Sequence, residues 1–532
     1  MITLYLPSTS VRHRTRRCWW VGLLIALSAT AYPPALAQPI SLRQLDRLVE
    51  RNRSLFQVPG IAVAIIQDGK LRVCKGYGLR SLRTRQPVTP QTLFGIASNS
   101  KAFTAAAIGL LVDEGKLHWD DPVIKYLPSF RLYDSLAASL LTIRDLLSHR
   151  SGLPTAAGDL MHDPDSTNFT LTDILFNQRF IKPASSFRSQ FAYTNNGYLV
   201  VGAIVAQVSG MSWEDFVEAR ILRPLGMIHS AASFQGCAHS PHIIDAHKRI
   251  GPSVRVVARY GSPKNDAAGG VYTSVAELSR WALVFLNRGQ YGPALSKRLL
   301  SDSVMAELVA PQTIIPVHQP GSYRTHFAAY GLGWFLSDVK GYKEIAHSGQ
   351  DVGMVSSINL LPELGLGVLV LTNSESGAAS AIGDQIVDSY LGIEGQDRTK
   401  ALYQREQAAL VVTQTGLDSI QQQLGQQPAL TKVELDSYVG VYQDRWFGRV
   451  RISVRDHQLW FAAERSGQLR GYLHRFSATQ FVVRWANPEL DSGALVTFIA
   501  SLGSTKRRFV LEELSSPRSG VYADLQFDQV EP

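Results

Sequence analysis

A serine and a lysine three residues apart, Ser98 and Lys101, stand at the start of a long apolar stretch that continues to Ile108. A helix that is apolar on every face belongs in the middle of a domain. Residues three apart share one face of a helix, so we expect Lys101 to point its amine back toward the Ser98 hydroxyl. Burial disfavours the charged form of lysine. The pair therefore predicts an activated serine nucleophile.

The same spacing occurs a second time in the chain, at Ser337 and Lys340. At average composition an S-x-x-K pattern arises by chance roughly once in a chain of this length. Lys340 is followed by Gly341, which predicts an ordinary hairpin turn there. Ser98 itself could be a plain helix N-cap. Spacing alone does not decide between these interpretations, and other motifs are needed.

Two further motifs stand at the boundaries of expected elements. Tyr193 and Asn195 come directly before an apolar helical stretch, and His347 to Gln350 end an expected strand. A tyrosine takes a proton only if its pKa, ordinarily about 10, is lowered, and the ammonium of Lys101 would lower it. An asparagine both donates and accepts, so Asn195 is suited to hold Lys101 and a substrate amide. The alternative for Tyr193 is a packed aromatic whose hydroxyl is satisfied.

The elements that must position these residues follow the order strands, many helices, strands, helix. Alternation and turn signals predict strands over 61–66, 71–74, 331–336, 344–347, 354–361 and 366–371. Helices are expected over 41–52, 98–108, 142–149, 196–207, 213–222 and 378–390, and Ser274 with Glu277 predicts a capping box for a helix that ends near Gly289. An α/β (α+β) fold satisfies this order, with an antiparallel sheet built from both ends, flanking helices and an inserted helical region.

A second, all-β domain is expected at the end of the chain. Residues 41–393 form the first domain, 394–432 a polar, glutamine-rich and partly helical linker, and 433–532 a β-rich accessory domain. Alternating segments such as 449–454 and 458–462, which flank Asp456, predict a β-sandwich or barrel. Its polar and aromatic positions could bind a ligand, and a spacer or a lid are the alternatives.

Residues 1–37 resemble a secretory signal peptide. Four arginines precede the apolar run from Trp19 to Ala31, and Ala35 to Ala37 form a small-residue cleavage site. The apolar run is too short for a normal membrane span, although an uncleaved N-terminal anchor is an alternative. Cleavage after Ala37 would give a periplasmic or secreted protein with no stable membrane span.

The net charge and the cysteine content exclude few classes of protein function. The formal net charge of +9 falls to +5 without the first 37 residues. The sequence contains no basic stripe interleaved with aromatic residues, so nucleic-acid binding is not predicted. Cys74 and Cys237 would remain after cleavage; a disulfide is possible in an exported protein, but we expect free, buried thiols. The histidines His239, His242 and His247 have no ligand spacing, so no metal or cofactor is expected.

Taken together, the motifs resemble the serine penicillin-recognising enzymes, which include class C β-lactamases, DD-peptidases and related esterases and D-aminopeptidases. The resemblance covers residues 45–392. Besides Ser98, Lys101, Tyr193 and His347, it includes the surrounding phrases Thr92–Gly95, Leu146–Pro154, Pro224–Met227 and Ala268–Val271. The final domain is similar to a small β-rich module that often follows such hydrolases.

The resemblance implies a role for each site residue. Ser98 would form an acyl-enzyme, with Lys101 and Tyr193 sharing the general-base task. Asn195, His347, Gly349 and Gln350 would bind the substrate, and the backbone amides of Ser98 and Gln350 would form the oxyanion hole.

One position departs from the pattern of the penicillin-recognising members, which carry lysine where this chain has His347. A mostly neutral histidine attracts a substrate carboxylate less strongly, which argues against efficient β-lactam turnover. Histidine here is similar to what esterase and D-aminopeptidase relatives carry.

Two functions follow from the sequence. The first is an exported serine hydrolase that acts on an ester or a peptide-like amide, as an esterase, a D-amino-acid peptidase or a weak β-lactamase. Its substrate would be a small molecule or a short peptide, with peptidoglycan as a further candidate partner. The alternative is a non-catalytic protein that binds peptidoglycan or lactams. The loops 161–168 and 310–325, which would set specificity, carry no readable code.

Overall fold

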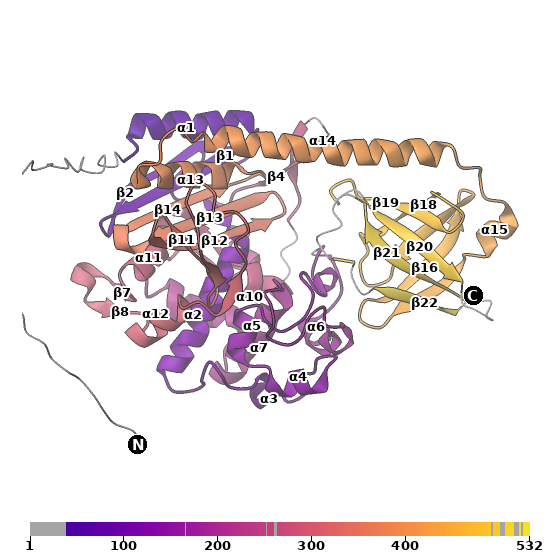
Figure 1. Cartoon of the computed structure of the whole chain (residues 1–532), viewed down its shortest axis with the longest axis horizontal. Helices are drawn as coiled ribbons and strands as arrows, with labels where there is room; N and C mark the ends of the chain where they lie inside the picture. Colours follow the sequence, from indigo (N-terminus) through magenta and orange to yellow (C-terminus); the bar gives the residue numbers. More distant parts are fainter. Residues whose placement is uncertain are drawn as a thin grey trace, which may run out of the picture.

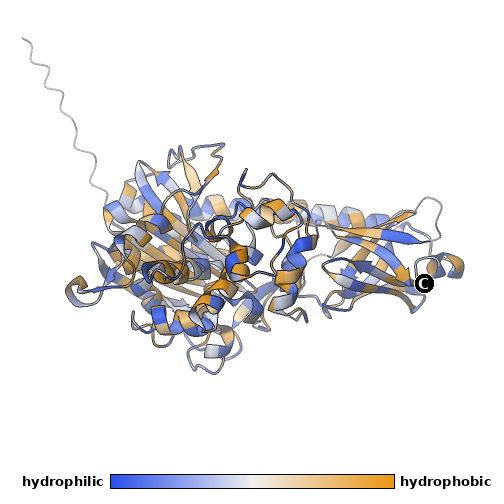
Figure 2. Cartoon of the chain, turned by 90° about the horizontal axis from the view of Figure 1, so that it is seen from below, coloured by the Kyte–Doolittle hydropathy of each residue, from blue (hydrophilic) through white to orange (hydrophobic). Residues whose placement is uncertain are grey.

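The computed structural model describes residues 39–531 apart from 165, 252, 260–262, 491–492, 501–505, 515–520 and 523–524 (Figure 1). The predicted signal peptide and Cys18 lie outside the described residues. Figure 1 shows a larger α/β part and a smaller β part, joined by one long helix. Figure 2 shows the same elongated arrangement from below, with apolar residues concentrated on the sheet and its covering helices.

A single antiparallel sheet of eight strands organises the larger part. From one edge to the other its strands are β2 Lys70–Gly78, β1 Gly60–Gln67, β14 Leu366–Thr372, β13 Met354–Leu361, β12 Tyr342–Asp351, β11 Phe335–Val339, β10 Ala328–Tyr330 and β9 Thr313–Ile315. The first two strands pair with the last one in sequence, because β1 lies against β14. The prediction of an antiparallel sheet made from both ends of the domain is therefore confirmed.

Each face of the sheet is covered by helices, and strand β1 shows why. Ile61, Val63 and Ile65 pack in one core with α1 Leu42–Leu55 and α13 Ala378–Leu391. Ala62 and Ala64 alternate with them and pack on the opposite face. Successive side chains of a strand point to opposite faces, so a strand covered on both faces is apolar throughout.

The inserted helical region lies on that opposite face, between β2 and β9 in sequence (Figure 1). Its helices are α2 Ser100–Asp113, α3 Val123–Tyr126, α4 Ser135–Leu140, α5 Ile143–Leu147, α6 Leu171–Asn177, α7 Asn195–Ser209, α8 Trp213–Val217, α9 Phe234–Cys237, α10 Asp266–Gly269, α11 Val275–Leu286 and α12 Asp302–Leu308. Three small two-stranded sheets accompany them: β3 Leu93–Gly95 with β6 Tyr272–Ser274, β4 Ala246–Ile250 with β5 Ser253–Val257, and β7 Gln290–Tyr291 with β8 Lys297–Arg298.

One local prediction is wrong, and a second is confirmed only in part. The strand expected over 331–336 is a turn for most of its length, because β10 ends at Tyr330 and β11 begins only at Phe335. Gly333 makes that turn with φ of 83°. The capping box at Ser274 is half formed: Ser274 accepts from the backbone of Glu277, but the Glu277 carboxylate instead accepts from Ser230 and from the His229 amide.

The polar connector is dominated by one helix, α14 Arg398–Gly425. Its first turn is held on the larger part by Arg398, which forms a paired hydrogen bond with the buried Asp388 carboxylate at 2.6 and 2.8 Å. Its far end contacts the smaller part, where the Gln423 side chain donates to the Phe476 carbonyl at 3.4 Å. The connector therefore joins the two parts as a helix and not as an extended tether.

The smaller part is a closed antiparallel barrel, which decides between the two predicted β architectures. Aromatic rings from different strands, including Tyr442, Phe461, Phe498 and Phe509, contact one another and are almost completely buried, so they fill the interior. After the short helix α15 Lys432–Asp436, the strands are β15 Gly440–Asp444, β16 Gly448–Arg455, β17 Gln458–Ala463, β18 Arg470–Arg475, β19 Gln480–Trp485, β20 Ala494–Ala500, β21 Arg507–Glu513 and β22 Gln526–Glu531.

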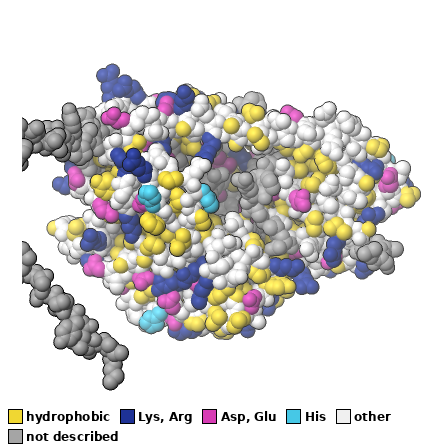
Figure 3. Space-filling view, viewed as in Figure 1, with side chains coloured by type: hydrophobic (Ala, Val, Ile, Leu, Met, Phe, Trp, Pro, Cys, Tyr) yellow, Lys and Arg dark blue, Asp and Glu magenta, His cyan; other side chains and the backbone are white. Residues whose placement is uncertain are grey.

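The distribution of charged side chains on the surface and the state of the two described cysteines agree with the expectations from the sequence. On the face in Figure 3, basic and acidic side chains are interspersed. Within the described ranges, no helix is both long and apolar enough to span a membrane. Cys74 is half-buried, Cys237 is buried, and both are free thiols.

Candidate active site

Ser98 lies in a tight 3₁₀ turn, Ala97–Asn99, that leads directly into α2. The residue before it, Ala97, has φ of 47°, a left-handed conformation that costs a non-glycine residue about 1 kcal/mol or more. Neighbouring side chains hold the turn: Asn99 donates to the Ser356 hydroxyl at 2.7 Å, and Ser100 accepts from the Val271 amide at 2.9 Å. This anchoring keeps Ser98 half-buried at the start of a buried helix.

Lys101 lies one turn further along and is completely buried. Its Nζ donates to Ser98 Oγ at 3.0 Å, to Asn195 Oδ1 at 2.8 Å and to the carbonyl oxygen of Ala268 at 3.0 Å. The predicted approach of the lysine amine to the serine hydroxyl is confirmed. The three partners come from separate elements, so the Ser98 turn, α7 and α10 together fix the amine.

Burial lowers the pKa of Lys101 from its ordinary 10.5 to about 7, although the charge of Asp159 works in the opposite direction. Desolvation disfavours the ammonium form, and none of the three hydrogen-bond acceptors carries a full charge. A large fraction of the lysine is then neutral near pH 7. A neutral amine 3.0 Å from Ser98 Oγ can accept the hydroxyl proton, which is the position of a general base.

Tyr193 lies beside Lys101, with the lysine Nζ 4.8 Å from the centre of its ring. The sequence predicted that the ammonium would lower the tyrosine pKa, and this prediction is wrong. Burial raises the pKa of Tyr193 well above its ordinary value, and hydrogen bonding with Ser98 offsets only part of the increase. The phenol therefore stays protonated at neutral pH and can donate a proton.

Asn195 connects Lys101 to the loop that contains Asp159. Its Oδ1 accepts from Lys101, and its Nδ2 donates to Asp159 Oδ2 at 2.9 Å. The other Asp159 oxygen contacts His162 Nε2 at 3.2 Å. Because a carboxylate only accepts, Asp159 fixes the amide orientation in which the oxygen faces Lys101.

Gly349 brings strand β12 directly against the Ser98 turn. A Cβ at this position would lie 2.1 Å from the Ile96 carbonyl oxygen and 2.9 Å from the Ser98 nitrogen. Only glycine allows so close an approach of two backbones. The strand therefore places Gly349, the residue before Gln350, against the backbone amide of Ser98.

His347 precedes this approach on β12 and is buried, at 3% exposure. Its Nδ1 lies 2.6 Å from the Ser348 carbonyl oxygen, and its Nε2 lies 2.9 Å from the Tyr330 hydroxyl. A carbonyl oxygen only accepts, so Nδ1 carries the proton and Nε2 accepts from Tyr330. Burial, together with the charge of Lys101, lowers the His347 pKa to about 3. The imidazole is neutral, and both of its nitrogens have partners within the protein.

Comparison with known protein families shows to which family the chain belongs. Residues 45–390 match the model of the Beta-lactamase family. The chain belongs to the β-lactamase family. Residues 425–528 of this family member match a domain of unknown function (DUF3471), a range that covers most of the barrel.

Several named proteins are similar to this β-lactamase-family chain. An unguisins hydrolase of Aspergillus campestris is 28% identical over 362 residues, which are 66% of each chain. Protein flp of Staphylococcus aureus is 27% identical over 339 residues, 63% of this chain and 64% of that protein. The chain thus spans slightly less than two thirds of the length of these relatives.

Solved structures share the fold. An octameric penicillin-binding protein homologue from Pyrococcus abyssi aligns over 92% of this chain and all of that one, with a TM-score of 0.57 and 22% identity. A class C β-lactamase from Rhodobacter sphaeroides aligns over 65% of this chain and 99% of that one, with a TM-score of 0.51 and 23% identity. The first of these alignments extends beyond the family domain into the barrel.

Some contributors to the site in this β-lactamase-family protein were not predicted as site residues. Asp159 orients Asn195, and the Ala268 carbonyl accepts from Lys101. His149 accepts from the Thr194 amide through Nδ1, and its ring centre lies 4.3 Å from that of Tyr193. Ala268 and His149 fall within phrases that carried the family resemblance, so a signal existed for them. Asp159 had none.

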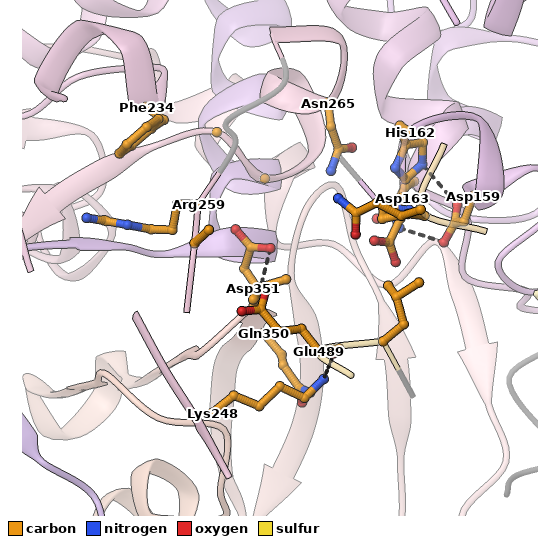
Figure 4. A pocket seen from close by; sticks show the side chains of 18 of the residues that line it. Asp159, His162, Asp163, Phe234, Lys248, Arg259, Asn265, Gln350, Asp351 and Glu489 are labelled. Carbon is orange, nitrogen blue, oxygen red and sulfur yellow. Dashed lines mark hydrogen bonds and ion pairs between the residues drawn. The ribbon is translucent and has the colours of Figure 1, made fainter. Parts of the chain in front are cut away.

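An open cavity of about 330 Å³ lies beside Asn195, whose side chain accepts from Lys101. Asn195 and Gln350 line it, together with Gly269 and Gly270. In Figure 4, Phe234 and Arg259 lie at one side of the cavity and Asp159, His162 and Asp163 at the other, with Gln350, Asp351 and Glu489 between them. The cavity is large enough for a small molecule or a short peptide.

The replacement Gly349→Ala is expected to lower kcat/KM by about 100-fold, because the new Cβ would push β12 and the Ser98 turn apart and a misplacement of about 1 Å is that costly. Initial rates against any hydrolysed ester measure it. Gly416→Ala in α14, where a Cβ meets no atom within 4 Å, is the matched control and should keep wild-type rates. Near-normal rates for Gly349→Ala would show that the close approach is unimportant.

Proposed function

We propose that this protein is an exported serine hydrolase that cleaves an ester or a peptide-like amide through an acyl-enzyme. The observation that carries the proposal is the contact between Lys101 Nζ and Ser98 Oγ at 3.0 Å, by an amine whose pKa is lowered to about 7. A structural lysine needs neither a serine partner nor a pKa near neutrality. Both are properties of an activated nucleophile.

The first half of the reaction follows from these positions. Lys101 takes the Ser98 proton as Oγ attacks the carbonyl carbon, and the bond from Oγ to that carbon forms. The backbone amides of Ser98 and Gln350 are the candidate donors to the resulting oxyanion. The proton then passes to the leaving oxygen or nitrogen, directly from Lys101 or through the Tyr193 phenol, as the bond to the leaving group breaks.

Deacylation reverses the proton transfer. Lys101, neutral again, takes a proton from a water molecule whose oxygen attacks the acyl carbon, and the proton returns to Ser98 Oγ as the acid product leaves. Asn195 holds Lys101 in place throughout, because its own orientation is fixed by Asp159. The chemistry needs a nucleophile, a base and oxyanion donors, all supplied by the chain.

The state of His347 supports an ester or amide substrate over a β-lactam. Its lowered pKa and its bonds to Ser348 and Tyr330 leave no positive charge there for a substrate carboxylate. An esterase, a D-amino-acid peptidase or a weak β-lactamase fits this site. The signal-peptide pattern of residues 1–37 supports export to the periplasm or the medium, where peptidoglycan fragments are candidate substrates.

A fluorophosphonate probe tests the nucleophile. We expect the probe to add once to the wild-type protein, with the adduct mapped to Ser98 by mass spectrometry, and not to add to Ser98→Ala. A panel of p-nitrophenyl esters, nitrocefin and D-amino-acid anilides then defines the reaction, with nitrocefin the slowest. Absence of labelling, or equal labelling of Ser98→Ala, would contradict the proposal. Saturable binding without turnover would instead favour a non-catalytic binding protein.

A further inference from the structure

The barrel is docked on helix α6 and on the loop that leads into it. Arg465, between β17 and β18, donates to Asp173 at 2.7 Å and to the Asn168 side chain at 3.0 Å. Its carbonyl oxygen accepts from the Asn168 amide at 2.9 Å. This loop begins at Asp159, which orients Asn195. The contacts therefore lie close in sequence to the catalytic centre.

Apolar contacts strengthen this docking. Phe169 of the catalytic domain and Phe447 of the barrel are both at most 4% exposed, with ring centres 6.2 Å apart. The Arg465 guanidinium lies 3.9 Å above the Phe169 ring. The buried Asn177 donates to the Trp446 carbonyl at 2.9 Å. Buried aromatic and hydrogen-bonded contacts of this kind hold two domains in one orientation.

Two barrel turns extend from this interface to the cavity beside Asn195. Gln468, Asn487, Glu489 and Leu490 all line the cavity that Asn195 and Gln350 also line. The turns are tied to each other, since Asn487 donates to the Gln468 side chain at 2.8 Å and accepts from the Glu489 amide at 3.0 Å. They are also tied to the catalytic domain, where Lys248 donates to the Glu489 carbonyl at 3.0 Å. One wall of the cavity is therefore built by the barrel.

The cavity carries far more acid than base. Its described lining residues include two basic side chains: Lys248, whose amine is held by the Glu489 carbonyl, and Arg259, whose guanidinium lies 4.9 Å from the Phe234 ring centre. The carboxylates among the lining residues are Asp159, Asp163, Asp266, Asp351, Glu375 and Glu489. A hollow lined by one sign of charge concentrates the field of that charge. Its potential favours a cation.

We propose that the barrel completes the substrate site and that Glu489 makes the enzyme select substrates carrying an ammonium group near the scissile ester or amide. This inference rests on the proposed hydrolase function and adds the charge class of its substrate. Glu489 is the one acid among the described lining residues that the barrel supplies. Neutral His347, two residues before Gly349 on β12, offers no competing attraction for a carboxylate.

The kinetic test uses three p-nitrophenyl esters whose acyl chains have one length and end in an ammonium, a methyl or a carboxylate group. We expect the full-length wild type to favour the ammonium ester by about tenfold in kcat/KM, the equivalent of about 1.4 kcal/mol. Glu489→Gln should remove most of this advantage, so that the ratio of kcat/KM for the ammonium ester to that for the methyl ester falls to about one. Glu489→Lys should favour the carboxylate ester. The exposed barrel acid Glu464, which does not line the cavity, supplies the control Glu464→Gln.

A binding test separates this inference from the proposed function. Hydrolysis-resistant anilides with the same three chain ends are titrated calorimetrically into Ser98→Ala and into Ser98→Ala with Glu489→Gln. The ammonium anilide should bind Ser98→Ala about tenfold more tightly than the methyl anilide does. This preference should be absent from the double variant. Equal binding of all three, or an equal loss of all three on Glu489→Gln, would overturn the inference. Selective ammonium binding by a protein that hydrolyses no ester would uphold it and reject the hydrolase.

Discussion

Ser98→Ala is expected to lower kcat by about 10⁴-fold or more on every substrate that the wild type hydrolyses, as loss of the nucleophile does in other serine hydrolases. The expectation rests on the partners of the Lys101 amine, among which Ser98 alone carries an oxygen that can attack a carbonyl carbon. The other two acceptors of the Lys101 amine are an amide oxygen of Asn195 and the backbone carbonyl of Ala268, and neither can replace an attacking oxygen. Initial rates on a p-nitrophenyl ester measure the effect.

The second S-x-x-K of the chain supplies the control. Ser337 lies on β11 and donates to Glu344 at 2.9 Å, while the Lys340 amine donates to the Leu391 carbonyl at 2.8 Å. Serine and lysine here have separate partners, and Ser337→Ala should keep kcat within about twofold of wild type. If Ser98→Ala kept a tenth of wild-type activity, or if Ser337→Ala lost as much as Ser98→Ala, the nucleophile would lie elsewhere.

Local geometry explains which parts of the site could be predicted. The contact between Lys101 and Ser98 follows from helical spacing alone, because positions three apart share a face. The roles of Asp159 and His149 depend on loops that fold back over α7, and no spacing rule connects them to Asn195 or Tyr193. Motif order indicated which segments meet, but not which buried polar groups accompany them.

The tyrosine prediction failed because it considered only one of two opposing effects. A neighbouring ammonium lowers a phenol pKa, whereas burial raises it. In the structure, burial also reduces the charge of the neighbour, since the pKa of Lys101 falls to about 7. Burial therefore weakens the ammonium charge that would lower the Tyr193 pKa, and it also raises that pKa directly. The extent of burial depends on packing by the whole domain, which the sequence of one motif does not contain.

In the fold, too, some elements could be predicted from the sequence and others could not. Strands β1 and β14 could be predicted because each is a continuous apolar run bounded by turns, and the order of elements indicated that both ends of the domain share one sheet. The turn at Gly333 interrupted an apolar segment that looked like a strand. The contact of Arg465 with Asp173 joins residues of two domains, and nothing in either segment predicts it.

Lys101→Met should lower kcat by about 10³-fold, because methionine fills the buried space without providing a base. The pH dependence carries the sharper expectation. The neutral amine is the active form, so kcat/KM of the wild type should rise with pH through about 7, the pKa to which burial lowers Lys101. Below that pH the lysine is protonated and cannot accept the Ser98 proton. The Met variant should lack this rise, which a pH series of initial rates detects.

Lys101→Arg distinguishes a base from a positive charge. Arginine stays protonated at every accessible pH, so it preserves the charge next to Tyr193 and cannot take a proton. If Lys101 is the base, Lys101→Arg should be as slow as Lys101→Met. If instead the lysine served only to stabilise a Tyr193 phenolate, Lys101→Arg should keep at least a tenth of wild-type activity. The raised pKa of Tyr193 argues for the first outcome, because a phenol that holds its proton cannot begin the reaction.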